Sequence, residues 1–170
     1  MEVNKIFFEW KIEKNIHLLT NNKKLLLLTL DFKLTTMITV EATINASLAT
    51  VWECFNQPEH VINWCFASDD WHAPRATGDL KVGGQFTTRM EAKDGSFGFD
   101  LTGYYDEIVP NALVKYHLED YRNVEVHFSE KDNEVHIVEK FDPESENPQD
   151  MQQMGWQMIL NNFKKYVESL

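Results

Sequence analysis

The stretch "MITVEATINASLATVWECF", residues Met37–Phe55, changes from a strand pattern to a helix pattern partway along its length. Its first half alternates apolar and polar side chains, which is the period of two of a half-buried strand. The apolar positions of that half are Ile38, Val40, Ala42 and Ile44. Ser47 is then a suitable N-cap, and the apolar residues recur at helical spacing: Leu48, Val51, Trp52 and Phe55. The stretch therefore predicts a strand followed directly by a helix.

The chain after this opening predicts a second short helix and then a long loop. Pro58 is well placed in the first turn of "PEHVINW", because proline is tolerated there. We expect Trp64–Gly78 to be a loop and "DLKV", Asp79–Val82, to be a short strand. Gly83 and Gly84 then supply the positive φ values of a tight turn.

Five further strands are predicted in the second half of the chain, and together with the two above they make seven. They are "QFTTRMEA", "FGFDLTGYYDEI", "LVKYHL", "VEVHF" and "VHIVEKF". The turns between them fall at Asp94-Gly95, "VPNA" and "EKDN".

The chain ends in one long predicted helix, with Asn147 as its cap and Pro148 at its first position. At 100° per residue its apolar side chains form two arcs, one of which is a stripe of methionines on the N-terminal half. A helix lying in the concave side of a curved antiparallel sheet would use both arcs. The polar positions are expected to face water; they are Gln153, Gln157, Asn161, Lys164 and Glu168. The order of elements predicts an α+β domain.

The first 36 residues differ from the rest in charge. They contain six lysines against four acidic residues, a net charge of +2. The whole chain carries −11, so Met37–Leu170 carries −13. Such a change marks a boundary between an atypical extension, residues 1–36, and a domain, residues 37–170. Two interpretations remain open: an appendage that packs loosely on the domain, or a natural start at Met37, which we favour.

The composition excludes several classes of function. A net charge of −11 disfavours nucleic-acid partners, which need a basic surface. Two cysteines, Cys54 and Cys65, are too few for a disulfide framework and favour a reducing cytoplasm. The longest apolar run, "LLLLTL", is far shorter than the roughly 20 residues of a membrane span. We expect no cofactor and no metal, and a monomer or a weak dimer.

Three segments together resemble a known family. They are the strand–helix–helix opening, "DLKVGGQFTTRMEAKDG" and the late "GWQMILNNFKKYV" with its Gly155-Trp156 pair. They resemble the activator of heat-shock protein 90 ATPase homologue-like family, within the START-like (SRPBCC, or polyketide-cyclase-like) superfamily. The resemblance covers Met37–Leu170 and implies a helix-grip fold, in which a curved seven-stranded antiparallel sheet surrounds the last helix and leaves a cavity.

The resemblance also implies a function. The superfamily mostly binds apolar small molecules in that cavity, and a few relatives are cyclases or hydrolases. We therefore expect binding of a small apolar molecule, lipid or polyphenol-like. The alternatives are a chaperone-interacting module and an enzyme acting in the same cavity, whose buried titratable groups would be His72, Arg89 and the Asp69-Asp70 pair.

The stretch "WCFASDDWHAPRATG", Trp64–Gly78, holds a thiol, two carboxylates and an imidazole. A nucleophile at Cys65 with His72 as its base, or a metal site of Cys65, Asp70 and His72, would need these groups to meet in space. No known signature or repeated spacing supports either. Two other roles suit this stretch better than catalysis or metal binding. One is structural, with Trp64 and Phe66 closing the second helix onto the core, and the other is a place on the rim of the cavity.

The candidate ligand-binding residues are aromatic rings, methionines and one histidine, chosen because such side chains suit an adaptable apolar wall. They are Trp64, Trp71, His72, Met90, Phe97, Phe99, Leu101, Tyr116, Met151, Met154 and Met158. Arg89 lies in a strand and is expected to be exposed near Glu91. The strand histidines, His117, His127 and His136, are expected to face solvent rather than bind a metal.

Overall fold

A computed structural model describes residues 36–170, and the expectations for residues 1–35 lie outside this range. The chain divides between Thr36 and Met37, and the unit Met37–Leu170 holds every described helix and strand. No helix among the described residues is long and apolar enough to cross a membrane.

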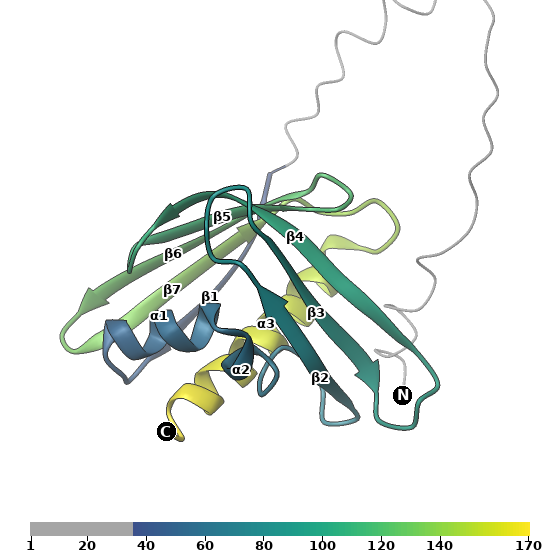
Figure 1. The fold of residues 1–170 in the computed structure, drawn as a ribbon, viewed down its shortest axis with the longest axis horizontal. Coiled ribbons are helices and arrows are strands. Elements are labelled where there is room, and N and C mark those ends of the chain that lie inside the picture. The colour runs from purple at the N-terminus through teal and green to yellow at the C-terminus, as the bar shows by residue number, and fades with distance from the viewer. Residues whose placement is uncertain (1–35) are drawn as a thin grey trace, which may run out of the picture. The chain divides into compact units, whose positions relative to one another are not determined.

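Seven strands form one antiparallel sheet that curls around a long helix (Figure 1). The order across the sheet is β1-β7-β6-β5-β4-β3-β2, so only β1 and β7 are neighbours far apart in sequence. The strands are β1 (Ile38–Ile44), β2 (Trp71–Gly78), β3 (Gln85–Ala92), β4 (Gly98–Val109), β5 (Leu113–Leu118), β6 (Asn123–Lys131) and β7 (Glu134–Phe141). The helices are α1 (Leu48–Asn56), α2 (Pro58–Val61) and α3 (Gln149–Val167). The predicted helix-grip fold is confirmed.

The opening strand and helix form as the sequence predicts. Ile38, Val40 and Ile44 are buried in β1, and the Ser47 side chain caps α1 by accepting a hydrogen bond from the Thr50 backbone N–H.

The second strand is not where the sequence pattern placed it. Trp71–Gly78, expected as a loop, is β2, while the expected strand Asp79–Val82 is the turn that joins β2 to β3. Pro74 obscured the pattern, because proline in a strand is normally confined to an edge or a bulge. β2 satisfies both conditions: it is an edge strand, and its register with β3 shifts between His72 and Arg75.

The glycines of the β2–β3 turn differ in their roles. Gly83 has a φ of 79°, as predicted, whereas Gly84 lacks a positive φ. Gly84 is required for space instead, because a Cβ there would lie 2.0 Å from the Asp79 carbonyl oxygen. The turn also docks on β4, since the Gly83 N–H donates to the Tyr105 carbonyl and the Tyr105 N–H donates to the Gly84 carbonyl. The predicted turn at Gly95, with φ of 73°, is confirmed.

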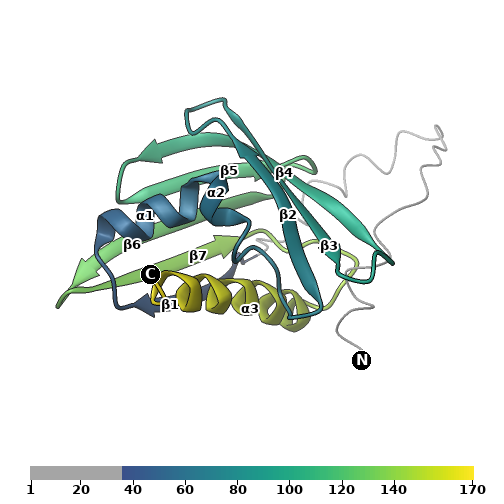
Figure 2. The ribbon, with the colours of Figure 1, turned by 60° about the horizontal axis from the view of Figure 1, so that its bottom comes forward.

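The concave side of the sheet holds α3, with α1 and α2 at one end (Figure 2). The closest backbone approaches of α3 are to β1 and, less extensively, to α1. Aromatic side chains, buried or half-buried, pack between α3, α1 and the sheet: the Trp156 ring stacks on Phe141 at 4.0 Å between centroids, and Phe163 packs against Trp64 and Phe55.

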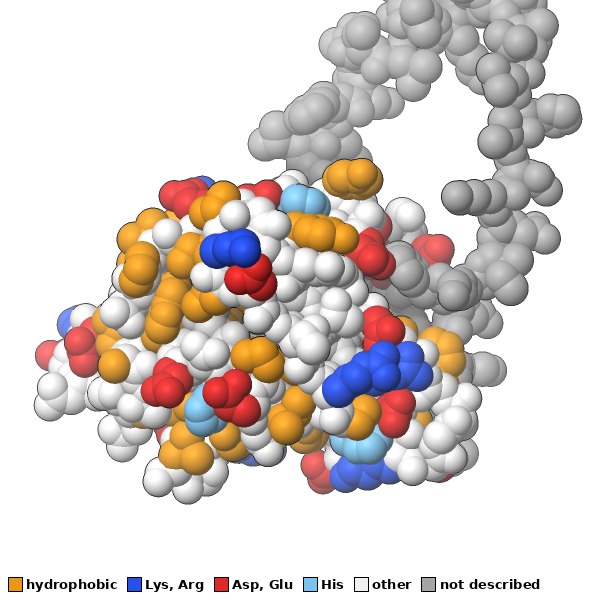
Figure 3. All heavy atoms as spheres, in the orientation of Figure 1, with side chains coloured by type: hydrophobic (Ala, Val, Ile, Leu, Met, Phe, Trp, Pro, Cys, Tyr) orange, Lys and Arg blue, Asp and Glu red, His pale blue; other side chains and the backbone are white. Residues whose placement is uncertain are grey.

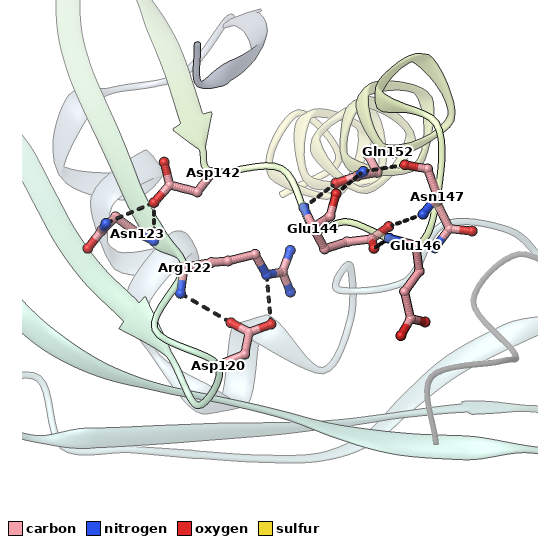
Figure 4. Close-up of polar contacts among 8 residues, drawn as sticks. All are labelled: Asp120, Arg122, Asn123, Asp142, Glu144, Glu146, Asn147 and Gln152. Carbon is pink, nitrogen blue, oxygen red and sulfur yellow. Dashed lines mark hydrogen bonds and ion pairs between the residues drawn. The ribbon is translucent and has the colours of Figure 1, made fainter. Parts of the chain in front are cut away.

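The start of α3 is held by a loop network that the sequence analysis did not foresee. Asn147 does not cap the helix; Pro148 is the N-cap residue and makes no side-chain cap. The buried Gln152 side chain accepts a hydrogen bond from the Glu144 N–H and donates to the carbonyls of Glu144 and Asn147 (Figure 4). The Glu144 carboxylate in turn accepts from the N–H groups of Glu146 and Asn147. These bonds fix the connection from β7 into α3.

The polar stripe of α3 is largely exposed, as expected, and it also contacts the free edge of β1. The Gln153 amide donates to the Thr39 carbonyl, and the Gln157 amide donates to the Glu41 carbonyl, each at 3.0 Å. Farther along, Lys164 donates to the Thr43 carbonyl, and Glu168 accepts from the Asn45 N–H at 2.9 Å. An edge strand exposes unpaired backbone groups, and here the helix side chains supply partners for them.

Candidate functional site

The inner face of the sheet is almost entirely apolar. Every second residue of each strand points its side chain to this face, and the strand register aligns these residues from β1 across to β2. The inner side chains of β1, β7 and β6 are mostly fully buried; examples are Val40, Ile44, Val126, Val135, Ile137 and Phe141. On β4 the inner residues Phe99 and Leu101 are only half-buried. Solvent therefore reaches the first half of β4 on this face, whereas Gly103 and Tyr105 farther along β4, and the β1 part, are covered.

An aromatic cluster lies at this part of the face, in which Phe97 and Phe99 are half-buried and Trp71 is buried. Trp71 is the first residue of β2 and lies opposite Ala92 of β3. Its ring centroid is 6.2 Å from Phe97 and 6.0 Å from Phe99, in tilted or edge-on geometry. Met90, which pairs with Phe99 across β3 and β4, is buried beside them. The structure brings together four of the residues that the sequence singled out.

One carboxyl group interrupts the apolar face. Glu139 of β7 is only 7% exposed, and Tyr116 on β5 is the side chain whose hydrogen bonding acts on its pKa. Burial raises the pKa of Glu139 to about 8, although the Tyr116 hydrogen bond acts in the opposite direction. Two more ionisable groups contribute to the electrostatics of this cluster: Tyr105 on β4 and Cys65 after α2.

These neighbours are all acids, and burial disfavours the charged form of each. Desolvation, followed by the nearby Glu139, raises the pKa of the Cys65 thiol to about 12. Desolvation raises the pKa of Tyr105 to about 12 and that of Tyr116 well above its ordinary value. At neutral pH the cluster therefore consists of uncharged hydrogen-bonding groups.

Trp64 and His72 lie away from the aromatic cluster. Trp64 is a core residue: its indole N–H donates to the Cys54 carbonyl at 3.0 Å, and its ring packs on Phe55 and Phe163. His72 follows Trp71 in β2 and therefore points to the outer face, where its Nε2 lies 3.2 Å from a Glu91 oxygen. Because side chains alternate along β2, Trp71 and His72 lie on opposite faces of the sheet, although both were predicted to lie on one loop.

None of the three candidate methionines on α3 is buried. Met151 and Met158 are half-buried, and Met154 is 44% exposed. The buried side of the helix consists of other residues, namely Gln152, Gly155, Leu160, Phe163 and Val167. The methionine stripe is therefore separate from the helix face that packs in the core.

The outer face carries paired charges, as expected for its arginine and histidines. Arg89 binds Glu91 at 3.0 Å, and both Arg75 and Arg89 approach Asp100. Blue and red side chains gather together over β2 and β3 in the space-filling view (Figure 3). His117, His127 and His136 each lie within 3.5 Å of a carboxylate oxygen, and no described group of three or more His, Cys, Asp or Glu residues could hold a metal ion.

The chemical groups of Trp64–Gly78 do not meet. Cys65 is buried beside Glu139, His72 lies on the outer face, and Asp69 and Asp70 are exposed. The Asp70 carboxylate accepts a hydrogen bond from Ser68. Neither the thiol nucleophile nor the three-ligand metal site weighed above is assembled by this arrangement.

Glu139 was not among the residues predicted from the sequence, although a signal for it was present. In "VHIVEKF", the alternation places Glu139 in phase with Val135, Ile137 and Phe141, which are all buried. A carboxylate in phase with a buried stripe is uncommon unless it is paired, and it identifies a position to examine. Tyr116 had been chosen only as an apolar wall, without its hydroxyl partner.

Comparisons with known proteins agree with this fold. The family model described as Activator of Hsp90 ATPase homolog 1-like protein matches residues 45–168. The solved structure of an AHSA1-like protein from Aeromonas hydrophila is 40% identical, with a TM-score of 0.75, covering 78% of this chain and 92% of that one. A protein from Cytophaga hutchinsonii is 50% identical, with a TM-score of 0.68 and the same coverage.

More distant structures share the fold alone. A protein from Nitrosomonas europaea is 13% identical, with a TM-score of 0.68, covering 79% of this chain and 96% of that one. No match was found among curated proteins.

Proposed function

Because the chain belongs to the Activator of Hsp90 ATPase homolog 1-like family, we propose that it binds a small, mainly apolar molecule on the inner face of its curled sheet. The bound molecule lies against the β3–β4 half of the sheet, on the side that α3 covers. Trp71, Phe97 and Phe99 form its apolar contacts, and Met90 packs beside Phe99.

The observation that carries this proposal is the uneven burial of the inner face. Phe99 and Leu101 lie on the same face as Val126 and Ile137, but only the latter two are fully covered. Large apolar side chains that remain accessible on a concave surface support binding of an apolar partner, because covering them is favourable by about 25 cal/mol per Å².

Two methionines of α3 are assigned to the margin of the same site. Met151 and Met158 are half-buried on the N-terminal half of α3, and methionine side chains adapt to differently shaped partners. We include them at the margin of the site, whereas the exposed Met154, the core residue Trp64 and the outer-face His72 are not needed for it.

Ligand binding is tested by thermal unfolding with the uncharged fluorophore N-phenyl-1-naphthylamine and a panel of uncharged lipids and polyphenols. A ligand at about one hundred times its dissociation constant stabilises the native state by roughly 2.7 kcal/mol. We expect Trp71→Ala and Phe99→Ala to weaken fluorophore binding at least tenfold. Tyr121→Ala is the matched control, because Tyr121 is an aromatic residue on the β5–β6 turn, 82% exposed. No stabilisation by any member of the panel contradicts the proposal.

A second candidate function is interaction with a chaperone, favoured by the family description and by the net charge of −11. An acidic surface accelerates and orients association with a basic partner surface. The test is association with Hsp90 at about 50 mM and 500 mM salt, together with the ATPase rate of the chaperone. Association that is lost at the higher salt supports this function, and absence of association at low salt rules it out.

A further inference from the structure

Three aromatic rings form a stack on the outer face of the sheet, where β4 meets β5. Tyr104 of β4 lies opposite His117 of β5, and their rings are stacked with centroids 5.5 Å apart. Tyr121, in the turn between β5 and β6, continues the stack, since its ring centroid lies 6.1 Å from that of His117 at an interplanar angle of 6°. His117 is on the outer face because Tyr116 and Leu118, on either side of it, are buried on the inner face. The stack is therefore separate from the proposed ligand site.

Tyr121 is the exposed end of this stack. It is 82% exposed, and its backbone has a φ of 65°, a left-handed conformation that glycine or asparagine adopts more readily than an aromatic residue. The turn is closed by other groups: the Tyr121 N–H donates to the Leu118 carbonyl, and the Asp120 carboxylate accepts from the Arg122 N–H (Figure 4). The turn therefore does not require a tyrosine side chain, and one face of the ring is free to contact a partner.

Two carboxylates lie on opposite sides of the stack. Asp106 is two residues beyond Tyr104 on β4, and both of its oxygens lie 2.9 Å from His117 Nδ1. Glu119 is two residues beyond His117, and its N–H donates to the carbonyl of Thr102, on the other side of Tyr104. No described lysine or arginine forms an ion pair with either Asp106 or Glu119.

The neighbourhood of the stack is acidic overall. Residues 103–122 contain four acidic residues and two basic ones. Both basic residues are already paired, Lys115 with Glu107 at 3.0 Å and Arg122 with Asp120 at 2.7 Å. The whole chain carries −11, so this surface repels nucleic acids and anionic membranes and attracts a positively charged partner.

We propose that this outer surface binds a partner protein through an arginine-rich segment. One guanidinium stacks on the exposed face of Tyr121 and pairs with the flanking carboxylates. Arginine fits best because its planar group stacks on aromatic rings and donates to carboxylates, whereas a lysine ammonium is a compact charge that does not stack. The residues of the arginine-binding surface are Tyr104, Asp106, His117, Glu119 and Tyr121. This inference goes beyond the ligand proposal, since the surface lies on the opposite face of the sheet.

The test uses two fluorescein-labelled peptides of equal charge, nona-arginine and nona-lysine. Their binding to the full-length protein is measured by fluorescence anisotropy at about 50 mM and about 150 mM salt, because screening weakens purely electrostatic attraction. We expect nona-arginine to bind at least fivefold more tightly than nona-lysine at the higher salt, since only arginine gains from stacking.

Variants separate stacking from charge. Tyr121→Ala should weaken nona-arginine at least fivefold and nona-lysine less than twofold, while Tyr121→Phe, which keeps the ring, should bind as the native protein does. Leu170→Ala is the matched control, because Leu170 is an apolar residue at the C-terminus, 70% exposed. Glu119→Gln should weaken both peptides more than Glu130→Gln, which removes an exposed carboxylate at the far end of β6.

Several outcomes overturn the inference. Equal affinity for the two peptides, or a Tyr121→Ala variant that binds nona-arginine as the native protein does, would mean that general acidity explains the binding. Absence of nona-arginine binding at the lower salt also refutes it. Sedimentation velocity adds one more test: a native dimer that Tyr121→Ala dissociates would show that a second copy of this chain occupies the surface instead. None of these results depends on fluorophore binding, so the two proposals fail separately.

Discussion

Protonation of Glu139 affects the stability of the fold. Its pKa is raised to about 8 in the folded protein, whereas an exposed glutamate titrates near 4.3. Between these values the unfolded chain has released the proton and the folded protein retains it. The stability contributed by the bound proton is therefore present below about pH 4 and is lost as the pH rises toward 8.

We expect Glu139→Gln to remove this part of the pH dependence. Glutamine does not titrate, so the variant should gain a few kcal/mol relative to the native protein between pH 5 and pH 8.5, at about 1.4 kcal/mol per pKa unit. Urea unfolding at pH 5, 7 and 8.5 measures the difference. An unchanged slope of stability against pH, with the variant folded, contradicts the assignment of a buried, protonated carboxyl.

The two turn glycines provide a second prediction at the scale of single residues. Gly83→Ala places a Cβ in open space at a φ of 79° and should cost about 1–2 kcal/mol. Gly84→Ala places a Cβ 2.0 Å from the Asp79 backbone oxygen, so the turn must shift, and we expect a loss at least twice as large. Chemical denaturation of both variants gives the comparison. Equal losses would show that the Gly84 contact is relaxed at little cost.

At the scale of elements, α3 stabilises the edge of the sheet as well as filling its concave side. Gln157 illustrates this because its amide donates to the Glu41 carbonyl and its oxygen accepts from the Glu41 N–H. The helix rises about 6.0 Å in four residues and a strand about 6.8 Å in two. This near match lets Gln153 and Gln157 reach successive outward carbonyls of β1, at Thr39 and Glu41.

We expect Gln157→Leu to destabilise the protein by about 1–2 kcal/mol, because both edge hydrogen bonds are lost and the β1 groups return to water. Urea unfolding measures the change, with Lys165→Ala, an exposed residue of the same helix, as control. A Gln157→Leu variant as stable as the control would show that water replaces these bonds at no cost.

The elements also show what the sequence could and could not predict. The strict alternation of Ile38–Ile44 and the Ser47 cap identified β1 and α1, because both signals are local. β2 was missed because Pro74 and the bulge interrupt its alternation. The polar stripe of α3 was assigned to water because a sequence does not distinguish a glutamine that contacts solvent from one that contacts a backbone edge.

The candidate site was likewise predictable only where local side-chain chemistry decided it. Trp71, Met90, Phe97 and Phe99 were chosen for their chemistry and do lie together, whereas His72 points away because one residue of register reverses a side chain. The Glu139–Tyr116 pair joins β7 to β5, and its two residues are 23 positions apart in the sequence. Such pairing depends on strand order, which local patterns do not give.

At the scale of the whole molecule, the sheet has two edges that are protected differently. Side chains of α3 cover β1, while β2 carries Pro74 and a bulge. A proline lacks the N–H that a neighbouring strand would bond, and a bulge twists the edge away from flat pairing. Together with the net charge of −11, these features predict a chain that does not associate through its sheet.

We expect Pro74→Val to increase self-association through β2, because it restores a donor and a strand-forming residue. Sedimentation velocity at increasing protein concentration should show a dimer for this variant and a monomer for the native chain. Thr77→Val, which keeps the proline in the same strand, should remain monomeric. A monomeric Pro74→Val variant, or a native chain that dimerises equally, contradicts this account of the edge.

The attachment of α3 along β1 also bears on the route by which the proposed ligand would enter. Moving α3 away from the sheet would break its hydrogen bonds to the backbone of Thr39, Glu41, Thr43 and Asn45. The edge of β1 would then lose these partners. We therefore expect α3 to stay in place when a ligand enters. We therefore expect the proposed ligand to enter at the opposite margin, beside Trp71 and Phe97.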